Sequence, residues 1–399
     1  MRQAWRATRT TPHVASTETR DKSPHGRTTS SFAPHLDIAI QFGYRQRMAT
    51  WRNLKPSELT HPTKCPALPR VVESDGQQSL ADLRAFVSAD RALLRDEMLK
   101  RGGFLLRGFE VNDPDSFADI IGALGYQPEA ENPFDTSPRS KVAESVYTST
   151  DTPDAYPILA HNENSFLNER PRMISFFCLV EPVRHGETPL FDSRAAASTL
   201  DPNVRAKLQE KKVCYRRRFP KKRPSWAPMI NRTWDEAFGT SDRDEIEAMV
   251  TAQGMVCQWH PNGRILHTEN VVDPLPRHPE TSEPCLNLQA FHRTSILQDL
   301  DEVRPRQNGL HNASLKMGLR LLYALDVMPV QILYGDGTPI SPDEMIEIRR
   351  ATWDHSVLFR WKKGDVLVLD NILTGHGRMN VEGPRKILAS FADPVSFPV

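Results

Sequence analysis

Two histidines and one glutamate constrain the fold of this 399-residue chain more than any other feature. His161 and Glu163 stand two positions apart, and His376 follows more than two hundred residues later. Two imidazoles and one carboxylate can hold Fe(II) on one face and leave its other positions open. In a strand, residues i and i+2 point the same way. We therefore predict that His161 and Glu163 share one strand face, and that a distant strand supplies His376.

Other interpretations fit the same three residues. Because a His-x-Glu pair often arises by chance, two surface histidines and a solvated glutamate are the simplest alternative. A zinc hydrolase or lyase uses the same ligand set with a bound water. His161 follows an apolar strand candidate and precedes a polar turn, which favours a site at the mouth of a barrel. His260, His267 and His292 have no partner at ligand spacing, so we expect them on the surface or in the core.

Composition narrows the class of protein. The formal net charge of +1 argues against a nucleic-acid binder and against a membrane-surface protein. The five cysteines are widely spaced and form no Cys-x-x-Cys, which favours a reducing compartment. The longest apolar run, Met173–Val180, is far too short to cross a bilayer. We expect a cytoplasmic protein without a nucleic-acid or membrane partner, and the sequence leaves its oligomeric state open.

The first 48 residues differ from the rest of the chain. Up to Ala33 they are rich in Ser, Thr, Arg and His and poor in large apolar residues. We expect residues 1–48 to be a disordered extension, or the product of an upstream start codon in place of Met48, followed by one domain over residues 49–399. An organelle transit peptide is the alternative, but Pro12, Glu18 and Asp21 spoil its amphipathic pattern.

Apolar periodicity and turn residues predict helices first and strands after them. Helical spacing runs over Ser79–Lys100, and Gly102 follows as a stop. The turn Lys362–Asp365 predicts a hairpin between Val357–Trp361 and Val366–Leu369. The pattern is typical of a mainly β barrel or sandwich with added helices. Further predicted elements are strands at Phe104–Gly108, Tyr156–Ala160, Met173–Val180, Thr188–Phe191 and Ile387–Ala392, and helices at Asp115–Leu124, Val204–Glu210 and Asp242–Gln253.

Five groups of residues, in a fixed order between Leu105 and Pro394, carry a family resemblance. They are Ala160–Asn164, Glu181–Pro189, Thr233–Thr240, Asp370–Asn371, and His376–Arg378 followed by Gly383–Leu388. In these groups the chain resembles the taurine dioxygenase (TauD/TfdA) superfamily of Fe(II)/2-oxoglutarate dioxygenases. Within that superfamily it is similar to the clavaminate synthase-like and syringomycin-pathway aspartyl hydroxylase-like branch.

The resemblance implies a double-stranded β-helix, or jelly-roll, core with N-terminal and inserted helices. It implies that His161, Glu163 and His376 bind Fe(II), and that 2-oxoglutarate and O₂ are the cosubstrates. Halogenating relatives carry a small residue at the carboxylate position so that chloride can bind the metal. Because Glu163 is present, oxygenation is favoured. Asp370 and Asn371 either orient the loop that carries His376 or make an ordinary turn.

The resemblance also assigns residues to 2-oxoglutarate. Thr188 matches a threonine that contacts the distal carboxylate of this cosubstrate, and Arg385 matches the arginine that pairs with it. A guanidinium binds a carboxylate with two hydrogen bonds and stays charged when partly buried, which supports this match. Two alternatives stay open. Lys386 takes the place of Arg385 if the strand has the opposite phase, and Thr188 is an ordinary turn residue.

Substrate contacts are less constrained. Arg378, two residues after His376, is a candidate for holding an anionic group, with a surface ion pair as the alternative. Asn287 and Gln289 share one strand phase and are candidates for the pocket lining. The basic segment Arg216–Arg223 is interpreted as a solvated lid loop, or as a patch that steers an anionic substrate or an acidic carrier protein towards the site.

These observations predict an Fe(II)- and 2-oxoglutarate-dependent dioxygenase of specialised metabolism. The resemblance implies release of succinate and CO₂ and hydroxylation of an unactivated C–H bond. The expected substrate is small and amino-acid-like, either free or tethered to a carrier protein; desaturation, epoxidation and ring closure stay open. The competing classes are a zinc hydrolase or lyase, which gives no role to Thr188 and Arg385, and a non-catalytic jelly-roll binding protein.

Overall fold

The computed structural model of the chain describes residues 49–76, 78–129, 139–149, 157–222, 232–290, 292, 309–324 and 328–397. The extension predicted for residues 1–48 lies outside these ranges. The single domain over residues 49–399 stays a prediction. Within the ranges given, no helix is both long and apolar enough to cross a membrane.

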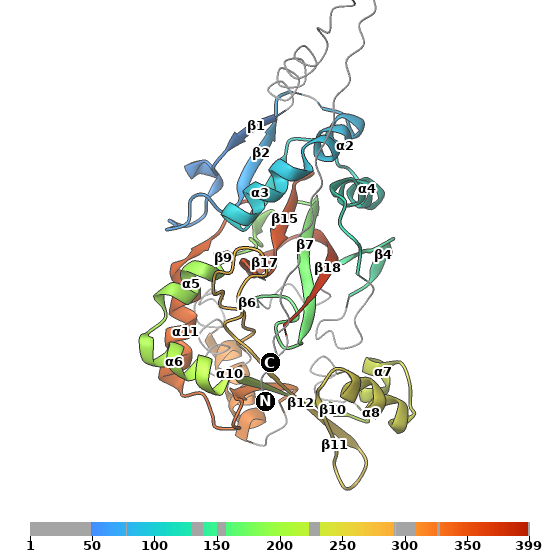
Figure 1. Ribbon diagram of the computed structural model, residues 1–399, viewed down its shortest axis with the longest axis vertical. Helices are drawn as coiled ribbons and strands as arrows, with labels where there is room; N and C mark the ends of the chain where they lie inside the picture. Colours follow the sequence, from blue (N-terminus) through green and yellow to red (C-terminus); the bar gives the residue numbers. More distant parts are fainter. Residues whose placement is uncertain are drawn as a thin grey trace, which may run out of the picture. The chain divides into compact units, whose positions relative to one another are not determined.

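Two β-sheets form the framework of the fold (Figure 1). The larger sheet has, in order, β1 (Ala49–Arg52), β2 (Arg70–Ser74), β3 (Gly103–Arg107), β15 (Val366–Asp370), β7 (Glu169–Val180), β18 (Lys386–Ser396), β5 (Val146–Thr148) and β4 (Lys141–Ala143). The smaller sheet has β14 (Ser356–Val357), β9 (Leu190–Asp192), β16 (Thr374–Arg378) and β6 (Ile158–His161). Both sheets interleave strands from the middle and the end of the chain, and together they form the predicted jelly roll.

A second four-stranded sheet and several helices complete the described chain. The sheet has, in order, β11 (Val256–Trp259), β12 (Ile265–Val272), β10 (Val213–Pro220) and β13 (Val330–Tyr334), and β8 (Arg184–His185) pairs with β17 (Val381–Glu382). The helices are η1 (Pro56–Glu58), α2 (Leu80–Ala89), α3 (Arg91–Arg101), α4 (Pro114–Leu124), α5 (Ser193–Thr199), α6 (Pro202–Lys211), α7 (Trp234–Phe238), α8 (Arg243–Ala252), α10 (Gly309–Ala324) and α11 (Pro342–Asp354).

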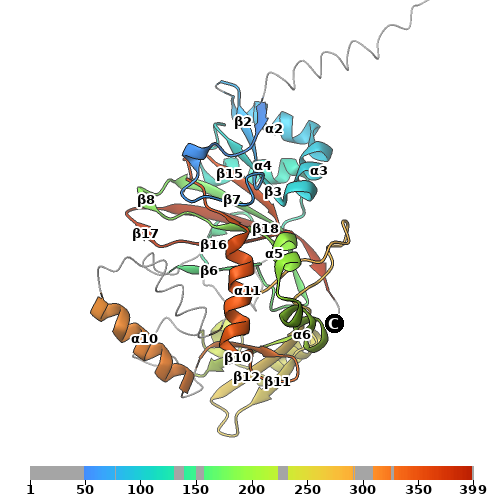
Figure 2. The same ribbon diagram turned by 90° about the vertical axis from the view of Figure 1, so that its left-hand side faces the viewer.

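Strand β15 shows how the larger sheet is buried on both faces. Val366 and Val368 pack with the side chains of α2 and α4, while Leu367 and Leu369 pack towards the smaller sheet. Because alternate residues of a strand point to opposite faces, a continuous apolar run serves both cores. Helices α5 and α11 contact each other and β9 beside the smaller sheet (Figure 2). The smaller sheet, which carries His161 and His376, therefore lies between two packed layers.

Two predictions about local structure were wrong. The helix expected over Ser79–Lys100 is two helices, α2 and α3, because the backbone leaves the helical region at Asp90 (φ −109°, ψ 22°). The expected hairpin is absent: Val357 pairs with Leu190 in the smaller sheet, whereas β15 pairs with β3 and β7 in the larger one. The turn at Lys362–Asp365 therefore carries the chain from one sheet to the other, because the segments on its two sides pair with different strands.

The lid interpretation of the basic segment was also wrong for its described residues up to Pro220. These residues belong to β10, which pairs with β12 on one side and β13 on the other. Arg217 is buried with its guanidinium 5.0 Å from the ring centre of Phe166 and 4.8 Å from that of Phe219. Arg216 pairs with Glu269 at 2.6 Å. Contacts with aromatic rings stabilise Arg217 in the sheet, and an ion pair with a carboxylate on the neighbouring strand stabilises Arg216.

Candidate active site

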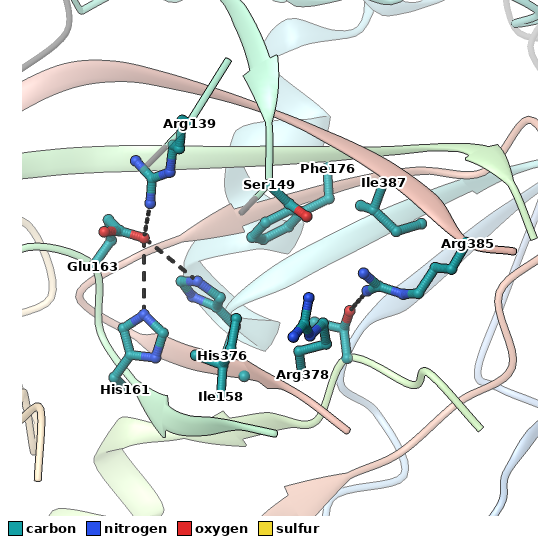
Figure 3. Close-up of a pocket in the computed structure, with 12 residues that line it drawn as sticks. Arg139, Ser149, Ile158, His161, Glu163, Phe176, His376, Arg378, Arg385 and Ile387 are labelled. Carbon is teal, nitrogen blue, oxygen red and sulfur yellow. Dashed lines mark hydrogen bonds and ion pairs between the residues drawn. The ribbon is translucent and has the colours of Figure 1, made fainter. Parts of the chain in front are cut away.

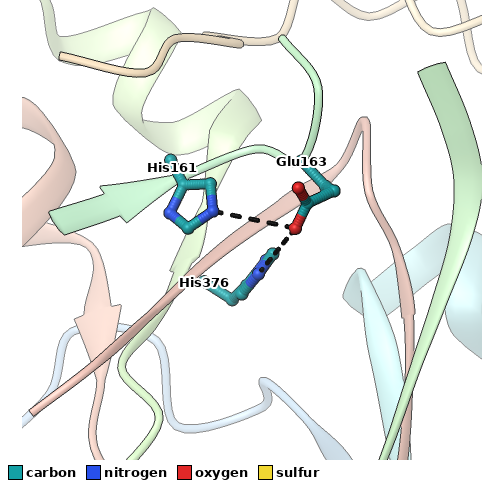
Figure 4. Close-up of side chains that lie close together, drawn as sticks. All are labelled: His161, Glu163 and His376. Atoms are coloured by element: carbon teal, nitrogen blue, oxygen red, sulfur yellow. Dashed lines mark ion pairs between the residues drawn. The ribbon is translucent and has the colours of Figure 1, made fainter. Parts of the chain in front are cut away.

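His161, Glu163 and His376 converge in the structure (Figure 4). His376 of β16 lies opposite His161 of β6 in the antiparallel register, and their ring centres are 4.6 Å apart. The Glu163 Oε2 atom lies 3.8 Å from Nε2 of His161 and 3.7 Å from Nε2 of His376. One ligand atom from each residue lies within 4.8 Å of the others, and all three residues are buried. This donor set fits one divalent metal ion on one face.

The two glycines beside His376 allow β16 to approach its neighbours closely. A Cβ at Gly375 would collide with the ring of Phe191, and a Cβ at Gly377 would lie 2.8 Å from the carbonyl oxygen of Ile158. The Gly-His-Gly sequence therefore permits the close pairing that puts the two histidines side by side.

Glu163 is not on the strand that its spacing predicts, since β6 ends at His161 and Glu163 lies in the turn that follows. Asn371 holds it there. The Asn371 Oδ1 accepts from the Glu163 backbone N–H at 2.7 Å, and Nδ2 donates to the carbonyl oxygens of Glu163 at 3.0 Å and Pro171 at 2.7 Å. One buried side-chain amide thus pairs both backbone groups of Glu163, as a neighbouring strand would.

Asp370 in turn anchors the segment that carries Asn371. Its Oδ1 accepts from the backbone N–H groups of Ile372 at 2.9 Å and Leu373 at 3.2 Å, and its Oδ2 lies 3.0 Å from Nε2 of His278. Burial would raise the pKa of the Asp370 carboxyl, but the hydrogen bond and charge of His278 keep it below its usual range. Asp370 and Asn371 therefore make a turn and also position Glu163. The sequence had suggested that they orient the loop that carries His376.

A pocket opens beside the three residues (Figure 3). Thr188 is buried in its wall, and its Oγ1 accepts from Nε1 of Trp361 at 3.0 Å and from Nη2 of Arg385 at 3.3 Å. The Nε of Arg385 also donates to the carbonyl oxygen of Gly186 at 2.9 Å. A hydroxyl has two acceptor positions and one proton. With both acceptor positions used, Thr188 has its proton left to donate, and a carboxylate is a suitable acceptor.

The pocket contains two more arginines. Arg378 of β16 is buried in its lining on the same side as Arg385 (Figure 3), whereas Lys386 is exposed. Arg139, which precedes β4, places its Nη2 2.9 Å from the Glu163 Oε2, with its guanidinium 4.4 Å from the ring centre of Phe391. Sequence reasoning missed Arg139, since it belongs to no motif. The full described lining is Arg139, Ser149, Ile158, His161, Glu163, Phe176, Thr188, His376, Gly377, Arg378, Arg385 and Ile387.

Comparison with known proteins identifies the family. Residues 66–390 match the family model described as "Taurine catabolism dioxygenase TauD, TfdA family". The chain belongs to the TauD/TfdA family. It is therefore a dioxygenase that depends on Fe(II) and 2-oxoglutarate, as the sequence predicts. Membership argues against both the zinc hydrolase and the non-catalytic binding protein.

The chain is also similar to individual proteins. The dioxygenase is 33% identical over 304 residues to the dapdiamide synthesis protein DdaC of Enterobacter agglomerans, covering 75% of this chain and 85% of that protein. It is 27% identical over 294 residues to a clavaminate synthase-like protein of Arabidopsis thaliana, covering 72% and 81%. Among solved structures it is similar to a taurine dioxygenase from Burkholderia xenovorans, with 15% identity, a TM-score of 0.45, and coverage of 88% and 91%.

The electrostatics of the TauD/TfdA site suit metal binding. Burial would raise the pKa of the Glu163 carboxyl, but the charge of Arg139 and the hydrogen bond of His161 hold it below its usual range. Burial and the neighbouring His161 lower the pKa of His376 to about 3. At neutral pH the site therefore offers a carboxylate and a neutral His376 imidazole, which are the protonation states that a metal ion requires.

Asn287 and Gln289 lie outside the described lining of the dioxygenase pocket. Asn287 donates through Nδ2 to the carbonyl oxygen of Ile372 at 2.9 Å. Gln289 forms a β-bridge with His161, and its backbone N–H donates to the Tyr215 hydroxyl at 2.8 Å. Both residues therefore support the walls of the site, and their contact with substrate stays a prediction.

Removing the Asn371 amide is expected to weaken the metal site. Asn371→Ala leaves both backbone groups of Glu163 without this partner, at a cost of about 1–3 kcal/mol for each buried polar group. We expect a lower free energy of unfolding in urea and roughly tenfold weaker Mn(II) binding, measured by electron paramagnetic resonance. Asn203→Ala, on the exposed surface of α6, is the matched control. Unchanged Mn(II) affinity in Asn371→Ala would show that Glu163 does not need the hydrogen bonds of the Asn371 amide to bind the metal.

Trp361 is expected to act on 2-oxoglutarate through Thr188. Trp361→Phe removes the indole N–H that donates to the Thr188 hydroxyl. The Thr188 proton is then no longer held in the direction that points away from residue 361. A single hydrogen bond contributes about 1 kcal/mol, so the KM for 2-oxoglutarate should rise roughly fivefold with little change in kcat. Trp353→Phe on α11 is the control. An unaltered KM would contradict the orienting role of Trp361.

Proposed function

We propose that His161, Glu163 and His376 hold Fe(II) in this dioxygenase, while Thr188 and Arg385 hold the distal carboxylate of 2-oxoglutarate. The enzyme would hydroxylate an unactivated C–H bond of a small, amino-acid-like substrate in specialised biosynthesis. The strongest support is that the three ligand atoms lie within 4.8 Å of one another, in the wall of the pocket that Thr188 and Arg385 also line.

The chain's own residues would bind and orient the reactants. When bound, Fe(II) supplies the activation of O₂ that is coupled to decarboxylation of 2-oxoglutarate to succinate and CO₂. Arg385 pairs with the distal carboxylate, and Thr188 donates its proton to the same group. Phe176 and Ile387 form apolar parts of the lining and limit access of water. His376, neutral at the pH of the cell, keeps a lone pair for the metal.

The substrate class rests on the relatives. DdaC is described as a dapdiamide synthesis protein, which supports a role in a biosynthetic pathway. We keep the amino-acid-like substrate as part of the proposal, either free or tethered to a carrier protein in the cytoplasm. Desaturation, epoxidation and ring closure need the same cosubstrate site, so the product decides among them.

A coupled turnover assay tests this function. Purified protein is incubated with Fe(II), 2-oxoglutarate and O₂, and succinate is measured with panels of free and carrier-bound amino acids. We expect Fe(II)-dependent succinate formation that the true substrate increases, and none with Zn(II). Absence of succinate from folded, iron-loaded protein in every panel would overturn the proposal. A product with an added hydroxyl, an epoxide or a double bond, identified by mass spectrometry, defines the reaction.

A further inference from the structure

Arg170, near the start of β7, is a buried cation to which the proposed reaction gives no role. Its exposed fraction is 0%. Within the described ranges its Nε and Nη2 have no hydrogen-bond partner, and no carboxylate forms an ion pair with it. Burial lowers the pKa of the guanidinium to about 10, so it stays charged at neutral pH. Because a buried charge without a partner is strongly unfavourable, Arg170 needs a counter-charge.

The two nitrogens without a partner lie on one edge of the guanidinium. Their N–H groups run parallel, which suits the two oxygens of a carboxylate. Arg107 shows this pairing in the same chain, because its Nε and Nη2 donate to the two carboxylate oxygens of Asp365 at 2.9 and 2.6 Å. In Arg170 the same edge meets no acidic side chain of the described residues. The edge is therefore suited to a carboxylate from outside the chain.

Neighbouring groups hold the Arg170 guanidinium in one orientation. Asn287 donates through Nδ2 to the carbonyl oxygen of Ile372 at 2.9 Å, which leaves its Oδ1 facing Nη1 of Arg170 at 3.5 Å. The ring centre of Phe397 lies 4.9 Å from the guanidinium carbon, and the Phe397 N–H donates to the carbonyl oxygen of Asn168 at 2.8 Å. A cation fixed in this way loses little freedom when it binds a ligand.

Arg170 also lies near the proposed metal site. It has the same strand phase as Phe176, which lines the pocket. The next residue, Pro171, accepts through its carbonyl oxygen from Nδ2 of Asn371 at 2.7 Å, and the same amide donates to the carbonyl oxygen of Glu163 at 3.0 Å. One side-chain amide thus joins the backbone beside Arg170 to that of Glu163. An anion at Arg170 would lie close to the segment that carries a proposed metal ligand.

We propose that the Nε–Nη2 edge of Arg170 is a binding site for a carboxylate, which supplies the counter-charge of the buried guanidinium. The carboxylate belongs either to the substrate or to a small free acid such as formate. This site goes beyond the proposed function, because the metal ligands and the 2-oxoglutarate contacts do not include Arg170. The first experiment below is independent of the proposed function, and the second rests on it.

Thermal melting of the full-length, metal-free protein tests the site with formate as the probe. Sodium formate is compared with sodium chloride at equal ionic strength, and should raise the Tm of the wild type by about 3 °C or more at saturation. Formamide, which is neutral and of similar size, should not. In Arg170→Met the gain from formate should vanish. Circular dichroism checks that this variant is folded, with Arg170→Gln as the replacement if it is not.

Arg385→Ala is the matched control, because formate also suits the arginine proposed for 2-oxoglutarate. A gain from formate that persists in Arg385→Ala and is lost in Arg170→Met supports the proposal. A wild type that gains no more from formate than from chloride overturns it, since water or chloride then suffices at this edge. A gain that survives in Arg170→Met, or disappears in Arg385→Ala, also overturns the assignment to Arg170.

Competition during turnover distinguishes the two sources of the carboxylate. Succinate formation stimulated by free amino acids is measured at saturating 2-oxoglutarate with increasing formate. If the substrate's carboxylate binds Arg170, formate raises the KM for the amino acid, and Arg170→Lys raises it about tenfold with little change in kcat. If a small free acid binds there, formate leaves this KM unchanged. Failure of every amino acid to stimulate succinate formation would count against the proposed function, while the melting result for Arg170 would stand.

Discussion

Glu163→Ala is expected to reduce Fe(II)-dependent succinate formation to background. The substitution removes one of three ligand atoms and leaves the Arg139 guanidinium, 2.9 Å from the lost carboxylate, facing the two histidines. Changes in groups that only support a ligand weaken metal binding by about 10- to 100-fold. Loss of a ligand, with a cation left in its place, should cost at least about 100-fold.

The comparison needs variants that separate charge from shape. Glu163→Gln keeps the size of the side chain but removes its charge, and should lose most of the Mn(II) affinity as well. Glu169→Ala, at the exposed start of β7, is the matched control and should behave as the wild type. Succinate formation in Glu163→Ala above about a tenth of the wild-type rate would contradict the assignment of Glu163 as a metal ligand.

Arg107→Met is expected to have the largest effect on stability. Arg107 is buried in β3, where Nε and Nη2 donate to both carboxylate oxygens of Asp365 at 2.9 and 2.6 Å and Nη1 donates to Glu58 at 2.7 Å. The substitution leaves two buried carboxylates without this partner. Breaking such a pair from one side costs about 3–5 kcal/mol. Urea denaturation should show a loss of this size.

An exposed ion pair is the control for Arg107. Arg84 on α2 lies 3.5 Å from Asp119, with 62% and 36% of the two side chains exposed. Arg84→Met should change the free energy of unfolding by less than about 1 kcal/mol. A loss from Arg107→Met as small as that from Arg84→Met would show that water replaces the guanidinium and that the cluster is not needed for folding.

The same cluster predicts how stability depends on pH. Burial alone would raise the pKa of Glu58, but hydrogen bonds from Arg52, Lys55 and Arg107 lower it from 4.5 to about 2. A carboxyl whose pKa is lowered on folding stabilises the protein above its unfolded pKa, and this contribution is lost as the pH falls through the folded pKa. The free energy of unfolding should therefore fall between about pH 4.5 and 2 in the wild type, and less so in Glu58→Gln.

The residues that converge at the candidate site were predictable where short motifs hold them. His161 and Glu163 stand together in one motif, and the Gly-His-Gly sequence around His376 reflects the close approach of β16 to its neighbours. Arg385 was assigned by the family resemblance, in the segment Gly383–Leu388 that follows His376. The reason offered for Glu163 was nevertheless wrong. Strand alternation does not position it, because β6 has ended; the Asn371 amide does.

Other features depend on tertiary contacts that a local pattern does not contain. Arg139 lies before β4, far from Glu163 in the sequence, so no local pattern predicts their ion pair. Trp361 was assigned to a hairpin strand, yet its indole N–H contacts Thr188 because the chain crosses between sheets after it. The basic segment was interpreted as a solvated loop because a charge pattern does not reveal that Arg217 is buried against Phe166 and Phe219.

The most direct test of the central claim is an anaerobic titration of the metal-free protein with Fe(II) and then 2-oxoglutarate. The two are expected to form a chelate with a visible metal-to-ligand charge-transfer band. In Arg385→Ala the band should need about 10- to 100-fold more 2-oxoglutarate, since a hydrogen bond to a charged group contributes about 1.5–3 kcal/mol. A folded, iron-loaded protein that gives no band with 2-oxoglutarate would contradict the account.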